Sequence, residues 1–140
     1  MSVLSRYALG VLALLALGAC DPRYVHPSDL SAQEIGRLSG TWAGRVPLSF
    51  SNRKDCPRVY VMTLAVKDGA VNGTVLDTAF QNADPATFTT FVEYDGSMHG
   101  RVRTRGYDFA LVGSFNHDGF KGTMRAEDCG YVMSIRHEGP

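Results

Sequence analysis

The sequence predicts an all-β fold: an eight-stranded antiparallel up-and-down β-barrel preceded by a short N-terminal helix. Asp-Gly pairs begin at Asp68, Asp95 and Asp118, each between runs rich in β-branched and aromatic residues. Asp-Gly is a strong hairpin signal because the favoured tight turns need positive φ. Apolar residues alternate along several of these runs, as half-buried strands require. Many short strands joined in sequence favour a barrel, because closure leaves no unpaired edge.

Residues 1–19 have the layout of an export signal. A single cation, Arg6, precedes residues 7–19, which carry no charge. As a helix this stretch would cover about 20 Å, whereas the hydrocarbon core of a bilayer is roughly 30 Å thick. It is therefore short for a membrane span and typical of a secretory signal.

The end of this stretch, Leu17-Gly18-Ala19-Cys20, resembles the lipobox of bacterial lipoproteins. The resemblance implies that Cys20 receives a diacylglycerol, that the signal peptide 1–19 is removed, and that the chain is held on the inner or outer membrane of a bacterial envelope. The domain would then lie in the periplasm or at the cell surface. Asp21 resembles an inner-membrane retention signal, but that rule differs among bacteria. An ordinary signal peptide cut near Ala19, or an uncleaved anchor, is the alternative.

Residues 20–30 are expected to form a flexible tether, since they hold two prolines and lack apolar periodicity. The domain then spans residues 31–140. It opens with Ser31 and Glu34 at the spacing of a capping box, so a short helix is expected from Ala32, ending near Gly40. One or two turns are not stable alone, so the helix must pack on the barrel.

Strand, turn and strand then follow each other to the end of the chain. A meander puts all the Asp-Gly turns at one end of the barrel, which we expect to be closed by the helix. The remaining connections lie at the other end. The predicted strands cover residues 41–48, 58–67, 70–77, 86–94, 97–103, 107–115, 119–126 and 130–137.

Two cysteines remain after Cys20. Exported compartments are oxidising, so Cys56 and Cys129 are predicted to form a disulfide that closes a loop of about 73 residues. Barrel closure supports this pairing, because the connections that carry both cysteines lie at the same end and are neighbours. Two free thiols are the alternative. The chain lacks a cysteine–histidine pattern at zinc spacing, so we expect no metal and no cofactor.

The motif Gly40-Thr41-Trp42-Ala43-Gly44, placed after a short helix, resembles the start of the calycin superfamily of lipocalins and avidin-like barrels. That resemblance implies that Trp42 plugs the closed end and that a basic residue of the last strand, Arg136, packs over the indole. A second lipocalin motif, Thr-Asp-Tyr, is absent, and the chain has a single tryptophan, so biotin binding is not inferred.

Charge and motifs exclude some classes of function. Without Arg6, 13 basic residues face 14 acids, and this balance does not favour nucleic acid as a partner. In the run from Arg101 to Arg105 every second residue is an arginine, so the arginines are expected to point outward from a strand. The run is either an exposed basic strand or a site for an anionic group. The sequence holds no recognisable catalytic motif, so we expect a protein that is not an enzyme.

The loop end is the expected site of recognition, because loops on a rigid scaffold commonly carry binding. Phe50 and Phe80 are predicted at the centre of this face, with Arg53, Lys54 and Arg105 on its rim. The alternative is that both phenylalanines fold back as a lid. The predicted function is a lipid-anchored envelope protein whose barrel acts as a binding or interaction module through its loop end, with an envelope protein or a small apolar ligand as the expected partner. Inhibition of a hydrolase, such as a protease or lysozyme, and carriage of a small apolar ligand are the alternatives, and the aromatic content predicts a filled interior that disfavours the carrier.

Overall fold

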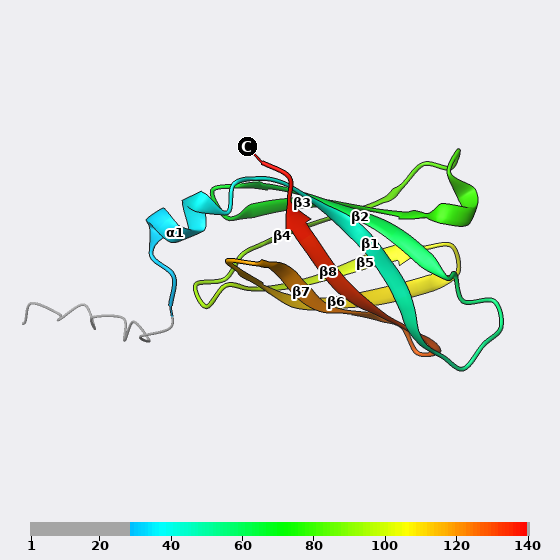
Figure 1. Ribbon diagram of the computed structural model, residues 1–140. Coiled ribbons are helices and arrows are strands. Elements are labelled where there is room, and N and C mark those ends of the chain that lie inside the picture. The colour runs from blue at the N-terminus through cyan, green and yellow to red at the C-terminus, as the bar shows by residue number, and fades with distance from the viewer. Residues whose placement is uncertain (1–28, 140) are drawn as a thin grey trace, which may run out of the picture.

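The computed structural model describes residues 29–139, in which eight antiparallel strands form one curled sheet (Figure 1). The predicted all-β barrel fold with a short N-terminal helix is confirmed. The predicted signal peptide and Cys20 lie outside the described residues. The strands are β1 (Gly40–Ser51), β2 (Val59–Lys67), β3 (Ala70–Asp77), β4 (Ala86–Phe91), β5 (Ser97–Thr104), β6 (Tyr107–Asn116), β7 (Gly119–Arg125) and β8 (Cys129–His137).

The strand order is β4-β3-β2-β1-β8-β7-β6-β5, so the first and last strands are neighbours, as a closed meander requires. The hairpin between β2 and β3 shows how local sequence sets the register. Lys67 pairs with Ala70, and the intervening Asp68 and Gly69 both have positive φ, at 48° and 86°. This is the backbone pattern of the tight turn that Asp-Gly favours.

The barrel is nearly rather than fully closed. In the described part of the chain, β4 and β5 form no ladder; an isolated bridge between Val92, just after β4, and Met98 of β5 joins the two edges. Side chains complete the contact: the Thr90 hydroxyl donates to the carbonyl of His99, and the Phe88 ring lies over Gly100. We call this β4–β5 junction the seam.

The barrel interior is filled, as the aromatic content predicts. Burial alternates along β2, β6 and β8, so inward-facing side chains from opposite walls meet in one core. The rings of Tyr60, Phe109 and Tyr131 pack edge to face with centroids 5.0–5.7 Å apart. The largest fully buried side chains are Tyr60, Tyr131, Phe109, Phe120, Met62, Leu64, Met98, Leu111, Met124, Met133, Ile135 and Val46.

Helix α1 (Ala32–Arg37) covers the Asp-Gly end, as expected, and its predicted capping box is present. The Ile35 side chain lies against Gly69, and Leu30 lies against Gly96, so the helical segment covers two of the Asp-Gly turns. The first described residues therefore lie at the closed end of the barrel (Figure 1). No helix within residues 29–139 is long and apolar enough to cross a membrane.

Trp42 plugs this end and is 4 % exposed. Its indole N–H donates to the carbonyl of Leu38 at 2.8 Å, which ties the helix to β1. The expected partner Arg136 is exposed, and the ring against the indole is that of His137, at 4.6 Å between centroids. The reason is strand alternation: Ile135 faces the core, so Arg136 points outward and His137 turns back to the indole.

Candidate functional site

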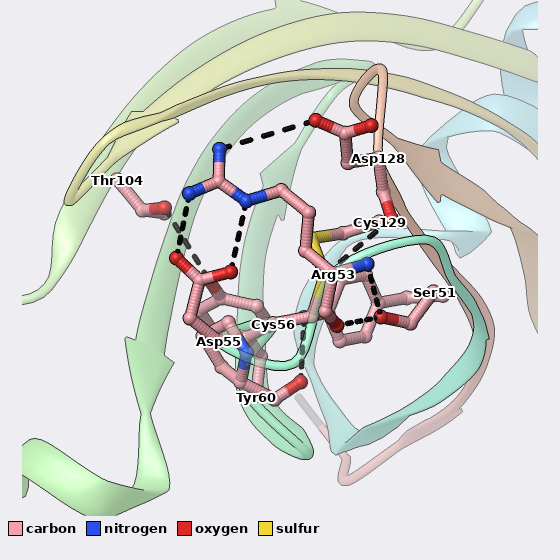
Figure 2. Close-up of a disulfide and its surroundings, with 10 residues drawn as sticks. Ser51, Arg53, Asp55, Cys56, Tyr60, Thr104, Asp128 and Cys129 are labelled. Atoms are coloured by element: carbon pink, nitrogen blue, oxygen red, sulfur yellow. Dashed lines mark hydrogen bonds and ion pairs between the residues drawn. A yellow bond between two sulfur atoms is a disulfide. The ribbon is translucent and has the colours of Figure 1, made fainter.

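The opposite end of the barrel, which we call the mouth, is braced by a disulfide (Figure 2). Cys56 in the β1–β2 connection is bonded to Cys129 at the start of β8, with 5.9 Å between their Cα atoms. The predicted pairing is therefore confirmed. The bond joins segments 73 residues apart in the chain, and both cysteines are buried.

Arg53 reinforces the same brace. Its guanidinium donates two hydrogen bonds of 2.9 Å to the carboxylate of Asp55 and lies 4.0 Å from the carboxylate of Asp128 (Figure 2). The hydrogen bond from Arg53 holds the pKa of Asp55 below its usual value. Arg53 was expected on the rim as a contact for a partner, but its charge is paired within the mouth itself.

The two phenylalanines expected at the centre of the mouth occupy different places. Phe50 belongs to β1 rather than to a loop, because β1 continues to Ser51 by pairing with β8; it lies opposite Gly130 and is 42 % exposed. Phe80 ends the 3₁₀ turn η1 (Thr78–Phe80) in the β3–β4 connection and is 46 % exposed. Neither ring is buried as a lid.

A cavity of about 290 Å³ opens at the mouth end of the seam. Phe80 and Arg105 are the predicted site residues that line it, whereas Phe50, Arg53 and Lys54 are not among the lining residues. Arg105 lies with its guanidinium carbon 4.3 Å from the centre of the Phe80 ring. The full lining consists of Asp55, Pro57, Tyr60, Val75, Leu76, Asp77, Phe80, Ala83, Asp84, Ala86, Thr104, Arg105 and Tyr107.

Tyrosine hydroxyls make the polar part of the cavity wall. The Tyr60 hydroxyl lies 3.3 Å from the hydroxyl of Thr104, whereas the Tyr107 hydroxyl is buried beside the carboxylate of Asp55. Burial raises the pKa of both tyrosines, and the nearby carboxylates of Asp77 and Asp55 add to the rise.

Sequence reasoning missed the acids of this cavity. Asp77 ends β3, and its side chain accepts a hydrogen bond from the Ala79 amide at the start of η1. Asp84 stands exposed later in the same connection. The available signal was the position of Asp77 directly before a connection, where aspartate commonly caps a turn.

The arginines of the basic run from Arg101 to Arg105 lie in two different places. Arg101 and Arg103 lie on the outside of β5, 3.9 and 3.7 Å from carboxylate oxygens of Asp108. Arg105 turns instead to Phe80 at the mouth. The run is thus an exposed basic strand, with its last arginine at the cavity. Among residues 29–139, no group of three or more histidine, cysteine or acidic side chains is placed to hold a metal ion.

Fold and site together define a small disulfide-braced β-barrel with a filled core and a shallow aromatic cavity at one end. No family model, no curated protein and no solved structure matches the chain. The function is therefore argued from the site itself.

Proposed function

We propose that this chain is a lipid-anchored protein of the bacterial cell envelope whose barrel is a binding module that engages its partner through the mouth. The lipobox-like sequence Leu17-Gly18-Ala19-Cys20 supports the anchor. The cavity between Phe80 and Arg105 carries the proposal for the binding face.

The position of the chain ends on the barrel supports this arrangement. Leu30 donates a backbone hydrogen bond to Tyr94 in the β4–β5 turn, and Glu138 donates one to Thr41, so both ends of the described chain lie at the closed end. Eight residues lie between Cys20 and Asp29, so the nine peptide steps reach at most about 30 Å. A lipid on Cys20 would hold the closed end nearest the membrane, leaving the mouth facing away.

The chemistry of the mouth suits recognition. Aromatic and arginine side chains are the commonest energetic anchors of protein interfaces, and Phe80 and Arg105 are both exposed at this end. The disulfide and the Arg53–Asp55 pair fix the neighbouring loop, which lowers the entropy lost on binding. The interior of the barrel is filled, which argues against carriage of a large apolar molecule.

Site-specific photocrosslinking in the native envelope tests the binding face. A photoreactive residue in place of Phe80 should yield discrete adducts, whereas the same residue in place of Val132 should yield none. Val132 is a matched control because it is 47 % exposed on β8, on the outer wall of the barrel. Adducts from Val132 but not from Phe80 would place the interaction on the wall instead.

A second candidate is inhibition of a hydrolase, favoured by the exposed position of Phe80 on a connection that projects from the mouth (Figure 1). A protruding apolar residue of this kind can enter an enzyme cleft. The purified chain would be assayed against lysozymes and proteases, with Phe80→Ala as the variant that should lose inhibition. Equal inhibition by wild type and variant would rule out this role for Phe80.

A further inference from the structure

We propose that the mouth cavity binds an organic ammonium group, either of a small free amine or of a lysine side chain on a partner. This inference rests on the proposed function, because it assigns a ligand chemistry to the same mouth. It is carried by the charges, the rings and the size of the cavity.

Carboxylates predominate among the charged groups of the wall. Asp55, Asp77 and Asp84 line the cavity, and Arg105 is the cationic residue among the lining residues. Asp55 is neutralised by its pair with Arg53, so an anion placed there would face the carboxylates of Asp77 and Asp84, whereas a cation would face Arg105. The pKa of Tyr60 is raised by Asp77, and that of Tyr107 by Asp55, after burial in each case.

The rings of the cavity offer a second attraction for a cation. Tyr60, Phe80 and Tyr107 all line it, and aromatic faces attract ammonium and guanidinium groups. Arg105 already shows this chemistry, with its guanidinium carbon 4.3 Å from the centre of the Phe80 ring. An anionic or purely apolar ligand would gain nothing from these ring faces by electrostatics.

The Tyr107 hydroxyl supplies the third element. It is buried beside the carboxylate of Asp55, and its oxygen can accept as well as donate a hydrogen bond. An ammonium group carries three N–H donors, so it can donate to the Tyr107 oxygen while it faces the carboxylates. An alkyl chain on the same ligand would lie against Val75 and Ala86 on the apolar part of the wall.

Size limits the ligand to a short chain. The volume of about 290 Å³ lies just below the range of roughly 300–1,000 Å³ typical of small-molecule sites. A lysine side chain or a short alkylamine fits such a space, and a folded peptide does not. Affinity should be weak, with a Kd on the order of 1 mM for so small a probe.

The test is an NMR titration of the purified full chain, with its disulfide oxidised, in a neutral detergent. The probes are n-pentylammonium, pentan-1-ol and pentanoate, which share a chain length and differ in charge. Pentylammonium should shift amide signals of residues 77–86 and 104–107 saturably, and the other two should bind at least tenfold more weakly. Equal or tighter binding of pentanol or pentanoate, or no saturable shift with pentylammonium, would overturn the assignment.

Variants that remove one charge sharpen the test, because loss of an acid and loss of the arginine should change the affinity for pentylammonium in opposite directions. Asp84→Asn should weaken pentylammonium binding about threefold, the effect of losing one solvent-exposed ionic contact. Arg105→Gln should strengthen it by a similar factor, since it removes a repelling charge and frees the Phe80 face. Glu127→Gln is the matched control: Glu127 is an exposed acid in the β7–β8 turn and does not line the cavity.

If pentanoate bound more tightly than pentylammonium, and Arg105→Gln weakened pentanoate binding while Asp84→Asn strengthened it, the cavity would be an anion site. Each variant would first be checked for an unchanged amide spectrum away from the mouth. A lysine blocked at both its amino and carboxyl ends separates the two sources of the ammonium group. Tighter binding of the blocked lysine than of pentylammonium identifies a protein side chain, and the reverse identifies a free amine.

The titration needs no partner, so its outcome is independent of the photocrosslinking experiment. Amine binding without adducts at Phe80 would contradict a protein-binding mouth while leaving the ammonium site intact. Adducts at Phe80 without amine binding would support a protein-binding mouth and contradict the ammonium site.

Discussion

Arg105 and Phe80 meet across the seam of the barrel, with 4.3 Å between the guanidinium carbon and the ring centre. Phe80 comes from the β3–β4 connection and Arg105 from the turn between β5 and β6. Near the other end, the Val92–Met98 bridge joins the same two edges of the sheet. The seam is thus held by side chains at the mouth and by backbone at the closed end.

Burial should decide what each aromatic residue beside the seam contributes to stability. Phe88 is 6 % exposed, and its ring occupies the space over Gly73 and Gly100, whereas Phe80 is 46 % exposed. Phe88→Ala should lower the free energy of unfolding by about 3–5 kcal/mol, the usual cost of a large cavity. Phe80→Ala should lower it by about 1 kcal/mol or less. Urea unfolding of both variants measures this, and equal losses would contradict the assigned roles.

The disulfide should supply a large share of the stability. Reduction, or the double change Cys56→Ala with Cys129→Ala, frees a loop of 73 residues. The chain-entropy relation gives a loss of about 4 kcal/mol for a loop of that length. Thermal and urea unfolding with and without reductant measure the loss. In the native unreduced protein, peptide mapping should find these two cysteines cross-linked, and two alkylatable thiols would be the contrary outcome.

Asp55 should titrate below its ordinary value of 3.8, because Arg53 donates hydrogen bonds to its carboxylate. A lowered pKa in the folded state means that the pair stabilises the fold above the unfolded pKa and loses this effect as pH falls through the folded value. Arg53→Gln should therefore raise the pKa of Asp55, as followed by carboxyl NMR signals. Arg136→Gln, a change of the same charge on the outer wall, should leave it unchanged.

His137, rather than Arg136, should stabilise the closed end. The His137 ring lies 4.6 Å from the indole of Trp42, and its Nε2 is 3.2 Å from the carbonyl of Ser39. His137→Ala should cost about 0.5–1.5 kcal/mol, whereas Arg136→Ala should stay within about 0.5 kcal/mol. Chemical unfolding compares the two. A larger loss for Arg136→Ala would restore the arginine–indole packing that the calycin resemblance implies.

Cys20 should be the mature N-terminus and should carry lipid. Mass spectrometry of the protein purified from its native membrane measures both, since lipidation adds mass to a peptide that begins at Cys20. Cys20→Ser should release the chain from the membrane fraction. An unmodified Cys20, or an intact Met1, would contradict the anchor.

Local chemistry made much of the fold predictable. The turn at Asp68-Gly69 depends on the φ angles of adjacent residues, and the cap at Ser31 depends on Glu34 three positions later. The alternation of buried and exposed side chains along β2 and β8 follows from the two-residue repeat of a strand. The Cys56–Cys129 bond was predicted from two cysteines in an exported chain, and the order of strands in a closed meander agrees with it because it brings both cysteines to one end.

The remaining features depend on contacts between distant segments. Phe50 belongs to β1 because β8 pairs with it across a register shift between Leu48 and Phe50, and no residue near Phe50 in the sequence signals that partner. The cavity likewise needs Phe80, Arg105 and Tyr107 to meet beside a seam whose position follows from the curvature of the whole sheet. The sequence by itself thus determined the number and order of the strands, the Asp-Gly turns, the helix cap and the disulfide, whose signals lie in short stretches or in strand order. Only the tertiary structure decided which mouth residues face one cavity, because that depends on how the sheet edges meet.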